Sequence, residues 1–129
     1  MPAVLITGAN RGIGLELTRQ YANSGWTVIA TCRNPINVGA LSRLIGNIQI
    51  HGLDVNNTKQ LIKLGESLNK KTNLNLLINN AGIYGSIYDG PVNNDAEDWI
   101  NVFKTNTIAP LNIAKVFFNH IKMGDGKLV

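Results

Sequence analysis

The sequence TGANRGIG, residues 7–14, directly follows a short apolar run, AVLI, at residues 3–6. A continuous apolar run of this length is typical of a strand that is covered on both faces of a parallel sheet. Behind the glycines, Ile13, Leu17 and Tyr21 recur every four residues, which predicts an amphipathic helix. A strand, a glycine-rich turn and a helix in this order predict an α/β fold.

Strand and helix patterns alternate along the rest of the chain, which predicts a parallel sheet with helices on both faces and right-handed crossovers. The patterns predict strands at residues 3–6, 27–31, 47–52 and 74–78, and the beginning of a fifth strand from residue 127. They predict helices at residues 12–24, 38–45, 57–68 and 95–122, and a loop at residues 84–94.

Composition excludes several classes of protein. The 129 residues suffice for one domain, and a single cysteine, Cys32, rules out an internal disulfide and favours the reducing cytoplasm. The apolar run at residues 3–6 is too short for a membrane span or a signal peptide, so we expect no membrane association. The net charge is +4, but the basic residues are scattered and do not alternate with aromatic residues. We therefore expect no nucleic-acid partner. His51 and His120 lack metal-ligand spacing, and no metal site is predicted.

The glycines of residues 7–14 have the spacing G-x-x-x-G-x-G. Glycine allows a close approach of the backbone to a ligand, and the free N–H groups at a helix start favour a bound phosphate. The loop lacks the Gly-Lys-Ser/Thr ending of a P-loop, which argues against hydrolysis of a nucleoside triphosphate. The alternative is a tight turn between strand and helix that binds nothing.

A second motif, NNAG at residues 79–82, follows the fourth predicted strand. In a doubly wound sheet the first and fourth strands are neighbours, and their carboxyl ends flank the ligand crevice. With these two motifs the whole chain resembles the short-chain dehydrogenase/reductase family. The stretches ATCRNP, residues 30–35, and NNAGIYG, residues 79–85, are most similar to C-factor and sniffer-type NADP-dependent carbonyl reductases.

The resemblance implies a Rossmann-like, doubly wound parallel sheet with strand order 3-2-1-4, in which the fifth strand is only begun. It implies one dinucleotide-binding domain at residues 1–129 that corresponds to the N-terminal half of the family and is incomplete at its C-terminus. It assigns the cofactor contacts to Gly8, Asn10, Arg11, Gly12, Ile13, Gly14, Arg33, Asp54, Val55, Asn80, Ala81 and Gly82.

The choice between NADP and NAD depends on the end of the second strand. An acidic residue there would hold the ribose hydroxyls of NAD, but Arg33 stands near this position instead. A guanidinium pairs with a 2′-phosphate through parallel hydrogen bonds, so Arg33, with Arg11 nearby, predicts NADP. The alternative is that Arg33 is a solvated loop residue. By resemblance Asp54 accepts a hydrogen bond from the adenine amino group; the alternative is a turn or cap aspartate.

The stretch from Lys104 to Pro110 lies inside the predicted long helix. A proline in a helix frees the carbonyl four residues back, here that of Asn106, and predicts a kink. The resemblance makes Asn106 a catalytic residue whose main-chain carbonyl holds a water in a proton relay. The alternative is a water that only satisfies this carbonyl. The helix also carries aromatic residues that we expect in the core and in a subunit interface, namely Trp99, Phe103, Phe117 and Phe118.

Reduction of a carbonyl by hydride transfer needs an acid for the developing alkoxide. The family uses a tyrosine in the pattern Tyr-x-x-x-Lys together with a serine, and no tyrosine of this chain is followed by a lysine at that spacing. We therefore expect the NADP-binding portion of a carbonyl reductase-like oxidoreductase, which does not catalyse alone and whose small carbonyl substrate requires a longer chain. The alternative is a non-catalytic dinucleotide-binding or interaction protein. An exposed sheet edge and helix predict a homo-oligomer.

Overall fold

The computed structural model describes residues 1–68, 72–85 and 95–129, and in them a five-stranded parallel sheet has the order β3-β2-β1-β4-β5. The strands are β1 (Ala3–Ile6), β2 (Thr27–Cys32), β3 (Ile48–Gly52), β4 (Leu76–Ile78) and β5 (Lys127–Leu128). The predicted fold class and strand order are confirmed. The fifth strand pairs with β4, Leu77 opposite Leu128.

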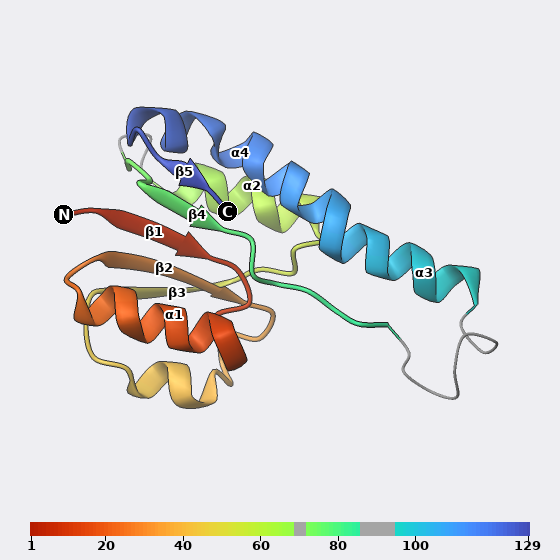
Figure 1. The fold of residues 1–129 in the computed structure, drawn as a ribbon, viewed down its shortest axis with the longest axis horizontal. Coiled ribbons are helices and arrows are strands. Elements are labelled where there is room, and N and C mark those ends of the chain that lie inside the picture. The colour runs from red at the N-terminus through yellow and green to blue at the C-terminus, as the bar shows by residue number, and fades with distance from the viewer. Residues whose placement is uncertain (69–71, 86–94) are drawn as a thin grey trace.

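Helices cover both faces of the sheet (Figure 1). They are α1 (Gly12–Asn23), the 3-10 helix η1 (Gly39–Arg43), α2 (Thr58–Ser67), α3 (Ala96–Phe103), the π-helical segment η2 (Lys104–Ile108) and α4 (Ala109–Met123). Helices α1 and η1 lie on one face, whereas α2 and α4 lie on the other. The predicted loop at residues 84–94 falls mostly outside the described residues.

Two apolar clusters, one on each face, hold the layers together. Val4 and Ile6 of β1 face α1 and η1, whereas Ala3 and Leu5 face α2 and α4. All four side chains of β1 are at most 6% exposed, which is why this strand has a continuous apolar sequence. Residues 7–14 therefore begin at the carboxyl end of β1, the fully buried strand at the centre of the sheet.

Helix α1 buries the predicted apolar row only in part, because Leu17 and Tyr21 are half-buried against the core cluster of this face but are not its most buried residues. Gly14, Thr18 and Ala22 are buried, whereas Ile13 is 74% exposed. Small residues occupy the buried row because the helix lies close to the sheet. The prediction that Ile13 begins the packed face was wrong, and its side chain is free to contact a ligand beside the glycine loop.

The predicted long helix is present, but Pro110 changes it in an unexpected way. The backbone stays helical from Ala96 to Met123, with π-helical geometry over η2 directly before α4. Within η2 the N–H of Ala109 donates to the carbonyl of Lys104, five residues back. A π-helical segment therefore stands where a kink was expected.

Three of the four aromatic residues expected in the core and in a subunit interface are exposed. Trp99 is 57% exposed, Phe103 56% and Phe118 62%, so these three do not pack in the core, and their place in a subunit interface stays a prediction. Phe117 is fully buried, as predicted. The buried residues of η2 and α4 are Thr105, Ala109, Ile113, Phe117 and His120.

Candidate functional site

The carboxyl ends of β1 and β4 are joined by Thr7, which is 1% exposed. Its Oγ1 accepts hydrogen bonds from the N–H groups of Asn80 and Ala81, both at 3.0 Å. Its own N–H donates to the carbonyl of Ile78 at 3.1 Å. One buried hydroxyl thus orients the two motifs, residues 7–14 and 79–82, toward one another.

The side chain of Asn80 completes this junction. Its Nδ2 donates to the carbonyls of Thr7 at 2.9 Å and Gly8 at 3.1 Å. A Cβ on Gly14 would lie 2.3 Å from the carbonyl oxygen of Gly8 and 2.5 Å from Nδ2 of Asn80. Only glycine therefore fits at position 14, because α1 begins in direct contact with the glycine loop and with Asn80.

The start of α1 is open to a ligand. Gly8 and Gly12 have positive φ angles of 65° and 54°, and a Cβ built on Gly12 would meet no atom of the described residues within 4 Å, its chain neighbours and the main chain of α1 apart. Arg11, at the N-cap, makes no side-chain hydrogen bond to the first turn. The first-turn N–H groups are thus left without a side-chain cap, which suits a phosphate at the positive end of the helix dipole. Asn10 is half-buried beside them.

Two cations flank this opening. Arg11 directly precedes α1, Arg33 directly follows β2, and both are exposed. The glycine loop is joined to the last residues of β2 by a hydrogen bond from the N–H of Ala9 to the carbonyl of Thr31, at 2.9 Å. Within the described ranges, the ion pair found is that of Arg19 with Glu16, so neither Arg11 nor Arg33 has a carboxylate partner there.

Asp54 builds a turn after β3. Its Oδ1 accepts a hydrogen bond from the N–H of Asn56 at 3.0 Å. Its main-chain carbonyl accepts a hydrogen bond from the N–H of Asn57 at 2.8 Å. The turn interpretation of Asp54 is therefore confirmed, whereas its contact with adenine stays a prediction. Val55 is half-buried and packs on the core cluster beneath the turn.

Asn106 holds the segment that follows NNAG. Its Oδ1 accepts from the N–H of Ile83 at 2.9 Å, and its Nδ2 donates to the carbonyl of the same residue at 2.8 Å. A Cβ on Gly82 would lie 3.3 Å from Oδ1 of Asn106. The side chain of Asn106 thus positions the main chain beside Ala81 and Gly82, a role that sequence reasoning missed.

Three further residues escaped sequence analysis. Thr7 was given no role beyond being the first residue of the glycine motif, and the bond from Asn56 Nδ2 to Thr105 Oγ1, at 2.8 Å, joins residues 49 positions apart. A threonine at the end of a buried parallel strand is the available signal for Thr7. No local pattern marks the other two.

The end of β2 also carries the chain's one thiol. Cys32 is 2% exposed, and burial raises the pKa of this thiol above its ordinary value. A buried thiol with a raised pKa is a poor nucleophile. Cys32 therefore acts as a small core residue beside Arg33.

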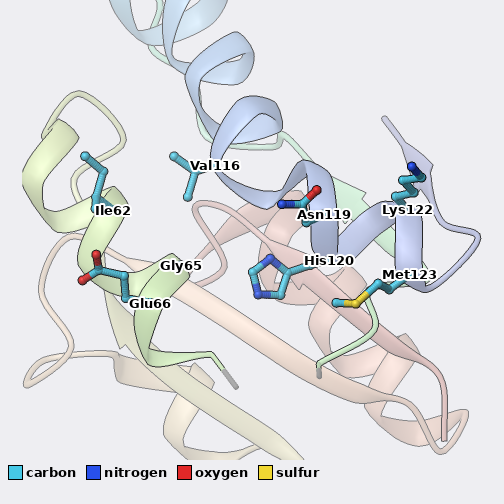
Figure 2. Close-up of a pocket in the computed structure, with 8 residues that line it drawn as sticks. All are labelled: Ile62, Gly65, Glu66, Val116, Asn119, His120, Lys122 and Met123. Carbon is cyan, nitrogen blue, oxygen red and sulfur yellow. The ribbon is translucent and has the colours of Figure 1, made fainter. Parts of the chain in front are cut away.

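A hollow between α2 and α4 lies on the face of the sheet away from α1 (Figure 2). It has a volume of about 930 Å³, and its lining includes Ile62, Glu66, Val116 and His120. Among the residues that the structure describes, neither ring nitrogen of the buried His120 has a hydrogen-bond partner. None of the predicted site residues lines this hollow.

Comparisons with known proteins identify the family of this chain. Residues 2–129 match the model of the short chain dehydrogenase family. An uncharacterized oxidoreductase of Schizosaccharomyces pombe is 32% identical over 133 residues, which span 96% of this chain and 51% of that protein. The NADP-dependent 3-hydroxy acid dehydrogenase YdfG of Shigella flexneri is 35% identical over 106 residues, which span 80% of this chain and 42% of that protein.

Solved structures lead to the same family. A carbonyl reductase from Pseudomonas aeruginosa PAO1 has a TM-score of 0.84 at 35% identity, over 94% of this chain and 57% of that one. The serine dehydrogenase from Escherichia coli has a TM-score of 0.84 at 30% identity, over 98% of this chain and 59% of that one. The chain spans about half the length of the curated relatives that it matches. With a family model matched over nearly all of its residues, the chain belongs to the short-chain dehydrogenase family.

Proposed function

We propose that this chain is the NADP-binding portion of a short-chain oxidoreductase of the carbonyl reductase kind, similar to the C-factor and sniffer-type enzymes. The observation that carries the proposal is the junction at Gly14, where α1 starts against Gly8 and Asn80 and leaves its first-turn N–H groups without a side-chain cap. A pyrophosphate would bind these groups, and Gly12 gives it room. A bound NADPH would supply the hydride for reduction of a carbonyl.

Each end of the proposed site would hold a different part of the cofactor. Arg11 and Arg33 would pair with the 2′-phosphate, because both guanidinium groups are exposed and lack a carboxylate partner in the described ranges. Asp54 and Val55 would contact the adenine. The main chain at residues 80–82 would lie along the adenine-side ribose and the rest of the cofactor. Asn106 would keep that main chain in place through Ile83.

The proposal is tested by titrating the purified chain with NADPH and NADH and following the fluorescence of the reduced nicotinamide. The unchanged chain should bind NADPH more tightly than NADH. Arg33→Asp should weaken NADPH binding by 10-fold or more, since it removes a charge-assisted contact and adds a repulsive charge, and should leave NADH binding nearly unchanged. Equal losses for both cofactors would contradict the assignment to NADP.

The alternative is a non-catalytic dinucleotide-binding or interaction protein. It is favoured by the absence of Tyr-x-x-x-Lys from this sequence. A turnover assay with NADPH and a panel of small ketones and aldehydes separates the two functions. We expect no turnover from the 129-residue chain by itself, and turnover from a chain that also carries the serine and the Tyr-x-x-x-Lys pattern.

The oligomeric state and the cellular location are further parts of this proposal. The exposed apolar residues of α3 and α4 support a homo-oligomer, in which they would be covered. The single free thiol, Cys32, supports a location in the reducing cytoplasm. In the part of the chain that the structure describes, no helix is both long and apolar enough to span a bilayer.

A further inference from the structure

One side-chain hydrogen bond joins the turn after β3 to the π-helical segment η2. Nδ2 of Asn56 donates to Oγ1 of Thr105 at 2.8 Å. Thr105 is 6% exposed, whereas its neighbours Asn106 and Thr107 are exposed. A buried hydroxyl that meets a distant loop constrains that loop more than a solvent-exposed bond would, because water competes less for it.

The turn that donates this hydrogen bond is fixed at both of its ends. On one side Asp54 follows β3, and its carboxylate accepts from the N–H of Asn56. On the other side Asn57 caps α2 by accepting from the N–H of Gln60 at 3.1 Å. Gln60 in turn accepts, through Oε1, from the N–H of Asp54 at 2.8 Å. These internal hydrogen bonds fix the conformation of the turn, and the bond to Thr105 fixes its position relative to η2.

Adjacent residues of η2 contact two different connections of the sheet. Thr105 holds the turn after β3, and Asn106 holds the segment after β4 through Ile83. Both connections leave the carboxyl edge of the sheet, since all five strands are parallel. The first carries Asp54 and Val55, and the second carries residues 80–82. These are the groups between which the adenosine half of a dinucleotide would lie.

We propose that Thr105 is a positioning residue for binding of the adenosine half of the cofactor. Its hydroxyl, acting through Asn56, sets the distance between the turn after β3 and the segment after β4. A ligand that contacts both connections binds more tightly when their separation is fixed beforehand, because less ordering accompanies binding. This inference rests on the proposed dinucleotide function.

The test compares Thr105→Val, which keeps the shape of the side chain but removes the hydroxyl, with Thr105→Ser, which keeps the hydroxyl. Thr107→Val, on the exposed side of the same segment, is the matched control. Isothermal titration calorimetry measures the dissociation constants of NADPH and of adenosine 2′,5′-bisphosphate. Thr105→Val should weaken both ligands about fivefold, the effect of one net hydrogen bond. The serine and control variants should stay within about twofold of the unchanged chain.

Asn56→Ala tests the same bond without altering the core, because Asn56 is exposed. It should weaken both ligands to a similar degree, and the double variant Asn56→Ala/Thr105→Val should be no weaker than either single variant. Hydrogen exchange of the Asn57 amide, which donates to Asp54, gives a readout without ligand and should be faster in both variants.

The two ways of failing are distinct. If the unchanged chain binds NADPH but Thr105→Val and Asn56→Ala bind it equally well, the positioning role is overturned and the proposed function stands. Losses that add fully in the double variant also overturn it, because the two side chains then act separately. If the unchanged chain binds neither ligand, the proposed function fails, and this role fails with it.

Discussion

At the scale of single residues, the most constrained position of the site is Gly14. We predict that Gly14→Ala lowers the free energy of unfolding by about 3 kcal/mol, because the new Cβ would overlap a main-chain carbonyl that cannot rotate away. The same substitution should abolish detectable binding of NADPH, since the start of α1 must move from Gly8 and Asn80. Urea unfolding and NADPH titration measure the two effects.

Gly12→Ala is the matched control for this prediction. Beyond its chain neighbours and α1 itself, its Cβ would meet no atom of the described part of the chain within 4 Å, but its φ of 54° is unfavourable for alanine. We expect a smaller loss of about 1 kcal/mol, from backbone strain alone. A loss at Gly12 that equals or exceeds the loss at Gly14 would show that the backbone angle, and not the close contact, explains why glycine occurs in this loop.

His51 should make stability depend on pH. Burial lowers the pKa of His51 below 6.5, and its buried Nε2 has no hydrogen-bond partner within residues 1–68, 72–85 and 95–129. The folded state therefore binds this proton less readily than the unfolded state does. Its contribution to the free energy of unfolding is fully present above pH 6.5 and is lost as the pH falls from there through the lower folded pKa.

Urea unfolding at pH 7.5 and at pH 5.5 checks this prediction. The loss of stability between the two pH values should be smaller in His51→Gln, which does not titrate, than in the unchanged chain. An NMR titration follows the His51 ring directly, and its midpoint should lie below 6.5. A midpoint above this value would mean that a neighbouring group favours the charged ring, contrary to the effect of burial.

Residue identity could be predicted from the sequence more readily than residue orientation. The glycine spacing and NNAG place Gly14 and Asn80 in the same site before any coordinates are known. The sequence does not reveal that the Asn80 side chain turns inward to two carbonyls, or that the hydroxyl of Thr7 receives two N–H groups. Hydrogen bonds between residues more than 70 positions apart depend on strand register, which no local pattern specifies.

At the scale of elements, the long helix shows where periodicity is ambiguous. Its sequence contains two apolar rows, and the row of larger residues, including Trp99 and Phe103, is the exposed one. The π-helical segment η2 adds to this difficulty, because a hydrogen bond to the fifth residue back shifts the face that the following residues present. Ile113 and Phe117 are buried after this shift. The position of Pro110 predicts an irregularity in the helix, but it does not predict that the irregularity is a π-helical segment.

The contact of η2 with the segment after β4 can be tested through the Asn106 side chain. Asn106→Ala should speed hydrogen exchange of the Ile83 amide and lower the free energy of unfolding by about 1–2 kcal/mol, since both hydrogen bonds to Ile83 are lost. Asn106→Asp keeps an acceptor for this amide and should leave it better protected than alanine does. The control Asn101→Ala, on the exposed side of α3, should change neither quantity. Equal exchange in all variants would mean that other contacts fix Ile83.

At the scale of the whole molecule, strand order and layer arrangement follow from the alternation of strand and helix patterns, so the architecture was the most predictable feature. Which apolar residues remain on the surface was less predictable. Large apolar residues on α3, η2 and α4 are at least half exposed: Trp99, Ile100, Phe103, Ile108, Leu111 and Phe118. A surface of this kind is uncommon on a protein that stays monomeric.

We therefore predict that the purified chain forms oligomers larger than the 14.0 kDa monomer, measured by size-exclusion chromatography with light scattering. Phe103→Glu/Phe118→Glu should shift the protein toward the monomer, because the charges would have to be buried without partners in the interface. The control is Ile36→Glu/Ile45→Glu, which changes two isoleucines of the connections on either side of η1 that are even more exposed, at 95% and 87%, and should leave the mass unchanged. A monomeric unchanged chain at high concentration, or dissociation by the control pair alone, would contradict an interface on α3 and α4.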